Sequence, residues 1–152
     1  MNDDIQYHAD ILAGRVSELL ARPPVYPSER RKIPMVSGVY LFSELGQGHL
    51  YVGVATSRTN HLRARILQHI PRPPARPRKS TAATLAERIA MEGVGVSSNK
   101  GVYDNEEFCE LFWALGPRIE HMDLRFIEVD DPAMARAMEK FAVWVLNPRY
   151  NH

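Results

Sequence analysis

The first half of the chain contains two tyrosine tripeptides whose residue types and spacing make them candidates for a catalytic or binding site. Gly38-Val39-Tyr40 and Tyr51-Val52-Gly53 each border an apolar run, and ten residues separate the two tyrosines. The separating segment, 43–49, contains two glycines. Apolar, β-rich runs on both sides of a glycine-containing loop predict a β-hairpin.

The register of this hairpin decides what the tyrosines face. With the centre of the turn between residues 45 and 46, Tyr40 lies opposite Tyr51 and both phenols emerge on one face. Gly38 and Gly53 are the next residues on that face, because side chains alternate along a strand. Two phenols beside positions without side chains leave room for a bulky group to approach. This arrangement suits a phosphate better than a packed core.

A single carboxylate stands out in the last apolar segment of the chain. Glu139 lies within residues 133–146, which are apolar almost all round and therefore predict a deeply packed helix. A buried carboxylate without a partner is costly, so it needs a cation. Arg136, one turn back, could supply a structural ion pair. A bound Mg²⁺ is the functional alternative, because such ions take one or two carboxylates together with water and phosphate oxygens.

Arg65 and His69 form a third candidate pair, four residues apart in a predicted helix, so both project from one face. A guanidinium binds phosphate oxygens through paired donors, and a neighbouring histidine can shuttle a proton or hold a phenol. Ordinary surface residues with this spacing are the alternative. Polar residues 147–152 follow the carboxylate helix directly, and a frayed C-terminus is the alternative reading there.

The net charge of +1 hides an uneven distribution of charged residues. Residues 45–86 contain no acid, whereas six acidic residues precede this stretch and twelve follow it. Such segregation is expected of a surface that binds a polyanion. A solvated basic loop is the alternative, but the position directly after the hairpin favours the binding surface. The seven cations of the stretch are Arg58, Arg63, Arg65, Arg72, Arg76, Arg78 and Lys79.

Size and composition indicate one globular domain. A chain of 152 residues with 45% hydrophobic and 24% charged content can bury a core without disulfides or metal. The single cysteine, Cys109, excludes an intrachain disulfide framework, and the scattered histidines offer no zinc pattern. No apolar stretch approaches about 18 residues and the N-terminus lacks a signal-peptide pattern, so we expect a cytoplasmic protein without membrane spans.

The elements that must position these residues follow from periodicity and cap residues. Asp131-Pro132 predicts the start of the last helix, Asp104 or Asn105 caps an earlier one, and Gly116-Pro117 ends it. The fold class expected is α/β (α+β), a small three-stranded, mostly antiparallel central sheet flanked by helices. Helices are expected over 4–22, from a cap within 56–60 to residue 69, over 81–91, from 104 or 105 to 115, and over 132–146, with a hairpin over 37–55 and a third strand over 121–129.

Together these residues resemble the GIY-YIG nuclease superfamily. The two tripeptides are similar to its two signature tripeptides, each with valine where isoleucine is usual. Family members place an arginine in the helix after the hairpin, often with a histidine four residues later, as in Arg65 and His69. They place a metal-binding glutamate in a later helix and an asparagine twelve residues beyond it, near an N-P-x-Y-N ending. Glu139, Asn151 and the NPRYN ending have these types and this spacing.

The resemblance covers residues 37–152 and leaves 1–36 as an N-terminal helical extension with a proline-rich connector. The loop before the arginine is longer than in compact members, so Arg63 is an alternative to Arg65, which is preferred for its relation to His69. A basic insert at about 71–104 also departs from the minimal domain and is a candidate for substrate selection.

The resemblance implies an endonuclease that hydrolyses phosphodiester bonds in DNA, with RNA left open, and that needs Mg²⁺ or Mn²⁺. It makes Tyr40 the general base, with His69 accepting its proton, and gives Glu139 the metal. Tyr51 would position water or phosphate, Arg65 would stabilise the charge on phosphorus, and Asn151 would orient the site by hydrogen bonding. The backbone of the nucleic acid would lie along Arg58, Arg63, Arg72, Arg76, Arg78 and Lys79.

Two further expectations concern partners and the class of protein. A homodimer could cut both strands of a duplex. The alternative function is a non-catalytic nucleic-acid-binding module with the same fold, and a protein-interaction domain forms a third class.

Overall fold

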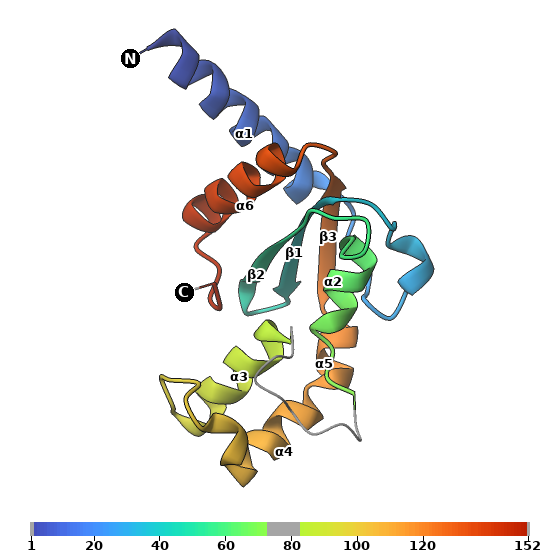
Figure 1. Cartoon of the computed structure of the whole chain (residues 1–152), viewed down its shortest axis with the longest axis vertical. Helices are drawn as coiled ribbons and strands as arrows, with labels where there is room; N and C mark the ends of the chain where they lie inside the picture. The colour runs from blue at the N-terminus through green and yellow to red at the C-terminus, as the bar shows by residue number, and fades with distance from the viewer. Residues whose placement is uncertain (1, 73–82, 152) are drawn as a thin grey trace.

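A three-stranded antiparallel sheet lies at the centre of the computed structural model, which describes residues 2–72 and 83–151 (Figure 1). The strands are β1 (Gly38–Glu44), β2 (Gly48–Ala55) and β3 (Asp123–Glu128), in the order β2-β1-β3. Both neighbours of β1 run antiparallel to it. Helices flank the sheet and one helix precedes it, so the predicted α+β fold class is confirmed.

The helices begin and end close to the predicted positions, with two corrections. Asn105 caps α4 and Asp131 caps α6 through side-chain oxygens, as predicted. The N-cap of α2 is His61 rather than a residue of 56–60. Helix α4 ends just before Gly116-Pro117, as predicted, but these two residues then open a further short helix, α5, that was not predicted. The helices are α1 (Asp3–Ala21), α2 (Leu62–Gln68), α3 (Thr84–Val94), α4 (Glu106–Ala114), α5 (Gly116–Glu120) and α6 (Pro132–Leu146), with 3-10 turns at Arg30–Lys32 and Val102–Asp104.

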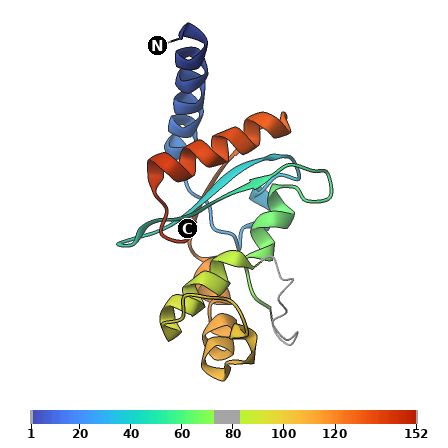
Figure 2. The same cartoon turned by 60° about the vertical axis from the view of Figure 1, so that its left-hand side comes forward.

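Two apolar clusters cover the two faces of the sheet. Val39, Leu41 and Val52 pack with α1 and α6 on one face. Tyr40 and Phe42 pack with residues of α2 to α5 on the other. Figure 2 shows α6 on one side of the sheet and α2 to α5 on the other. The alternation of β1 side chains therefore separates a purely apolar layer from the layer that contains the tyrosines. None of the helices in the described residues combines the length and apolarity needed to cross a membrane.

The expected hairpin register is wrong by two residues. Tyr40 pairs with Gly53, and Phe42 pairs with Tyr51. The loop is centred on Gly46, which has φ +80°, and the register shifts again between Phe42 and Ser43. Each of these features moves the pairing by one residue. A shift of two keeps both tyrosines on one face, where their ring centroids lie 6.4 Å apart.

The space beside the tyrosines is filled, contrary to expectation. A Cβ atom at Gly53 would collide with the ring of Tyr40, and one at Gly38 would collide with the carbonyl oxygen of Ile127 and with Leu62. Tyr40 itself is fully buried. The glycines therefore allow close packing of Tyr40 and of β3 against the hairpin, so the space at Gly38 and Gly53 is not where a phosphate could enter.

The last helix is also less buried than its composition suggested. Its buried residues are Ala135, Met138 and Ala142, whereas the side chain of Trp144 is 79% exposed. A helix on the outside of one sheet face buries one stripe, and its apolar residues elsewhere face solvent.

We predict that Gly53→Ala destabilises the protein by about 1–3 kcal/mol, because the added methyl group must displace the enclosed ring of Tyr40. The matched control is Gly14→Ala in α1, where a Cβ atom meets nothing within 4 Å. In a helix interior that change should stabilise by about 0.5–1 kcal/mol. Urea unfolding of the three proteins measures both effects, and equal stability of Gly53→Ala and the parent would contradict the packing described.

Candidate active site

A hydrogen bond between two buried side chains forms the centre of the candidate site. The hydroxyl of Tyr40 on β1 lies 2.7 Å from Nε2 of His69, the residue that caps the C-terminus of α2. Both side chains are fully buried. The ring of Tyr51 on β2 contacts the same imidazole edge-on, with centroids 4.9 Å apart. Two strands and one helix thus bring three aromatic rings together.

The second ring nitrogen of His69 fixes the direction of this hydrogen bond. The backbone N–H of Leu85, in the first turn of α3, donates to Nδ1 at 3.3 Å. A nitrogen that accepts carries no proton, so the proton of the neutral imidazole is on Nε2 and is donated to the Tyr40 oxygen. Burial, and then the charge of Arg65, lower the pKa of His69 to about 3. This arrangement differs from the expected one, in which His69 accepts the proton of Tyr40.

Arg65 is the arginine that lies with the phenols. Burial raises the pKa of Tyr40 and of Tyr51, and the Arg65 guanidinium lowers both. The side chain of Arg63 instead turns to the connector, where its Nε donates to the carbonyl oxygen of Ile33 at 2.8 Å. Arg63 is thus directed to the connector, whereas the charge of Arg65 reaches both phenols of the candidate site.

Glu139 lies on α6 with its side chain half-buried. Burial raises the pKa of its carboxyl, while Lys140 and Arg65 lower it, and its own charge raises the pKa of both tyrosines. Within residues 2–72 and 83–151 it forms no ion pair with Arg136, which is exposed. The structural ion pair considered from the sequence is therefore not formed.

Of the carboxylates that the structure describes, Glu139 is the one whose charge raises the pKa of both tyrosines. Among the described residues, no three or more His, Cys, Asp or Glu side chains gather as metal ligands do. A lone carboxylate suits a hard divalent ion that takes its remaining ligands from water and from a substrate phosphate. It does not suit zinc, which needs three or four protein ligands.

Asn151 holds the strand that carries Tyr51. Its Oδ1 accepts the N–H of Val52 at 2.7 Å, and its Nδ2 donates to the carbonyl oxygen of Val52 at 2.8 Å. The N–H groups of Tyr150 and Arg149 donate to β2 carbonyls as well. The C-terminal residues thus cover the outer edge of β2 and are not frayed. Asn151 bonds the backbone beside Tyr51 rather than another side chain of the site.

Two residues of α3 belong to this site and were missed by sequence reasoning. A hydrogen bond from Thr84 and the charge of Arg88 each lower the pKa of Tyr51. Both lie on one face of α3, because they are four residues apart. That spacing was a usable signal, but α3 lies in the segment 71–104, which was expected to be an insert outside the minimal domain.

The remaining basic residues are only partly placed. Arg58 and Arg72 are exposed, at the end of β2 and after α2. Arg76, Arg78 and Lys79 lie outside the described residues.

No protein-family model, no curated protein and no solved structure matches this chain. The geometry of the site alone must therefore carry an argument about function.

We predict that His69 is neutral, with its proton on Nε2, throughout about pH 5 to 8, because its pKa is lowered to about 3. Proton-coupled ¹⁵N spectra of protein labelled at histidine report both nitrogens, and His69→Gln identifies the signals. A proton on Nδ1, or a titration within this pH range, would contradict the assignment.

Proposed function

We propose that the protein is a metal-dependent endonuclease of the GIY-YIG type that hydrolyses phosphodiester bonds in DNA. One observation carries the proposal: Arg65 from α2 and Glu139 from α6, a half-buried carboxylate with no ion-pair partner among the described residues, lie close enough to the phenols of β1 and β2 for their charges to shift the pKa of both Tyr40 and Tyr51. Clusters of ionisable groups that shift each other's pKa values are characteristic of active sites.

The donors present fit Mg²⁺ or Mn²⁺. Glu139 would hold the ion, since its carboxylate has no other ion-pair partner among the described residues. When bound, such an ion polarises a non-bridging phosphate oxygen and stabilises the leaving 3′ oxygen. Arg65 would bind the phosphate and stabilise the charge that develops on its oxygens.

Tyr40 would act as the general base and Tyr51 would position the water. Burial raises the pKa of the Tyr40 phenol, so at neutral pH the free protein holds it protonated. Nε2–H of His69 and the guanidinium of Arg65 both favour the phenolate, because donors and positive charge stabilise the charged form. Tyr51 is only half-buried and reaches the solvent from which the water comes.

DNA would follow Arg58 and Arg72, two exposed cations on either side of α2 in the sequence, through salt-sensitive phosphate contacts. We place the enzyme in the cytoplasm. The single cysteine supports this, because Cys109 is free and burial raises the pKa of its thiol, as expected of an inert residue in a reducing compartment.

Plasmid nicking with Mg²⁺ tests the proposal. We expect Tyr40→Phe to lower the rate about 10²–10⁴-fold, as the loss of a general base does. Arg65→Ala should lower it about 10²–10³-fold, and Glu139→Gln should reduce Mg²⁺-dependent nicking to the background without metal. Tyr26→Phe, Arg31→Ala and Glu110→Gln are matched controls at exposed positions and should keep the parental rate.

Equal rates for parent and site variants would mean that the nicking comes from elsewhere. Absence of nicking by the parent with any divalent ion, while it still binds DNA in the presence of a chelator, would identify a binding module instead of a nuclease.

The pH dependence gives a second test. The rate should rise with pH, with a slope of log kcat/KM near one between about pH 6.5 and 9, because the phenol of Tyr40 must lose its proton to act as a base and burial raises its pKa. His69, with its pKa lowered to about 3, should add no inflection. A plateau above about pH 7.5 would instead indicate an acceptor with the usual histidine pKa. Tyr40→Phe should remove the slope.

A further inference from the structure

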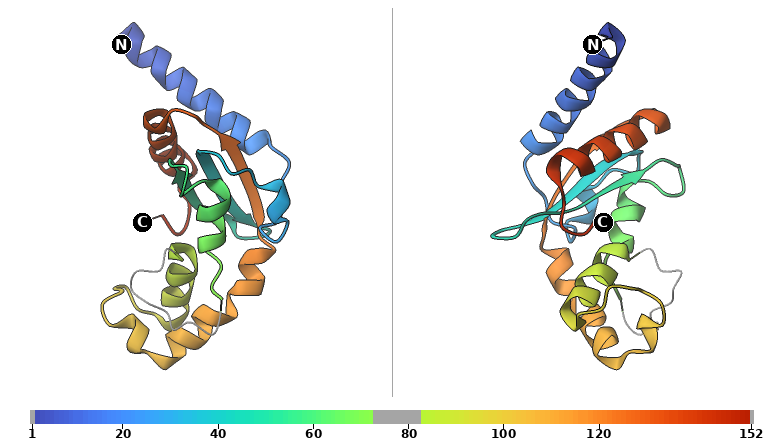
Figure 3. Two further views of the ribbon diagram at one scale, coloured as in Figure 1. Left: turned by 45° about the vertical axis from the view of Figure 1, so that its right-hand side comes forward. Right: turned by 90° about the vertical axis from the view of Figure 1, so that its left-hand side faces the viewer.

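The apolar stripe of α1 continues beyond the body of the protein. The apolar residues of this stripe are spaced alternately four and three positions apart, as along one continuous face of a helix: Ile5, Ala9, Leu12, Val16 and Leu19. The rest of the chain covers only its C-terminal part: Leu19 and Val16 are buried and Leu12 is half-buried, whereas Ile5 is 59% exposed. The two views of Figure 3 show the N-terminal half of α1 extending past the sheet and α6.

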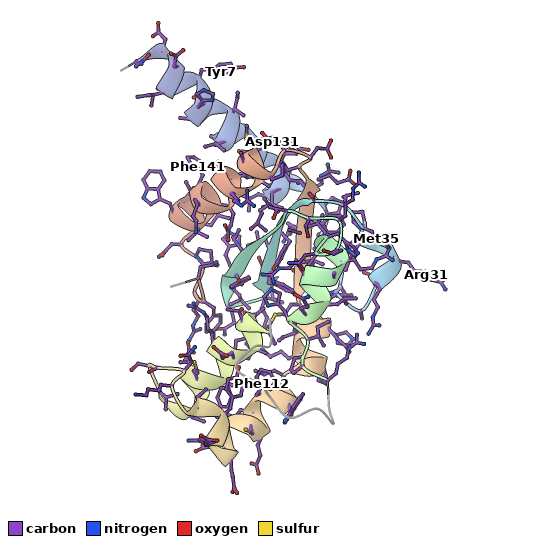
Figure 4. All side chains as sticks on the ribbon, in the orientation of Figure 1. Tyr7, Arg31, Met35, Phe112, Asp131 and Phe141 are labelled. Carbon is purple, nitrogen blue, oxygen red and sulfur yellow. The ribbon has the colours of Figure 1, made fainter. Side chains whose placement is uncertain are left out.

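The outer face of α6 offers a second uncovered surface with apolar residues. Arg136, Lys140 and Trp144 lie along this face, at spacings of about one helical turn, and all three are exposed. The ring of Phe141 packs against that of Trp144, with centroids 6.0 Å apart. Figure 4 shows Phe141 on α6 and Tyr7 on the projecting half of α1.

The two surfaces carry opposite charges. Residues 2–14 of α1 and its cap contain three aspartates and no lysine or arginine. The outer face of α6 carries Arg136 and Lys140. Two projecting halves of α1 would repel each other through their aspartates, and nucleic acid would be repelled in the same way. A basic helix face with an exposed tryptophan is the surface that complements the acidic half of α1.

We propose that two copies of this chain associate by placing the N-terminal half of α1 of each copy on the outer face of α6 of the other. Each copy gives its α1 to the other, so a two-fold dimer contains the contact between α1 and α6 twice. The buried apolar area is therefore twice that of a single contact. Ile5 and Ala9 would meet Trp144, and the aspartates would meet Arg136 and Lys140. The assembly is independent of the proposed nuclease activity.

Sedimentation velocity tests this assembly. The full chain should pass from monomer to dimer between about 2 and 200 µM, the range expected for a small interface. Asp4→Lys with Asp10→Lys should weaken association about tenfold or more, and Arg136→Glu with Lys140→Glu should do the same. Mixing these two doubly substituted proteins should restore the dimer, because both contacts then join opposite charges again.

Mixing the two substituted proteins distinguishes weakened association from misfolding, because a second chain would not restore a misfolded helix. Glu107→Lys with Glu110→Lys is the matched control, with one substitution in the first turn and one in the interior of α4. It should leave association unchanged. A monomer at every concentration, equal weakening by the control, or a mixture that stays monomeric would each overturn the proposal.

Discussion

The buried hydrogen bond between Tyr40 and His69 is the interaction on which the rest of the structure depends. Two polar side chains enclosed in an apolar core are tolerated when they are hydrogen-bonded. Nε2 of His69 meets the phenol, and Nδ1 meets the backbone N–H of Leu85. One imidazole therefore joins β1, α2 and α3, and it fixes how the first turn of α3 approaches the sheet. Gly53 completes this constraint, because only a residue without a side chain leaves the ring of Tyr40 in place.

The same constraint makes the described part of the 71–104 insert a component of the site. With Leu85 held by His69, the neighbouring Thr84 and the next turn with Arg88 are brought to Tyr51. The insert is therefore part of the layer that encloses the tyrosines. On the other side of the hairpin, Asn151 fixes the strand of Tyr51 from its free edge. Both tyrosines are thus held by residues far in sequence from the two tyrosine tripeptides.

Signals local in the sequence predicted the helices and strands well. The site contacts depend on residues far apart in the sequence, so they could not be predicted in this way. Asn105 and Asp131 cap the helices that their types and positions predicted, and the predicted third strand forms over Asp123–Glu128. The hairpin register could not be obtained from alternation, because a loop centred on Gly46 and an irregularity at Phe42 each shift it by one residue. The role of Gly53 depends on which side chain lies across the strand. The choice of Arg65 over Arg63 depends on the carbonyl of Ile33, in a segment whose fold the sequence left open.

The charge balance of the site follows from this packing. Tyr40, Tyr51 and Glu139 can each become negative, and each raises the cost of ionising a neighbour, while Arg65 is the cation that acts on all three. Burial removes the water that would otherwise offset this imbalance. Ionisation of a phenol here is therefore coupled to the arrival of further positive charge near Glu139. The divalent ion proposed for Glu139 would supply two charges at once, and the hydrogen bond from neutral His69 would support the phenolate without adding a charge that repels that ion.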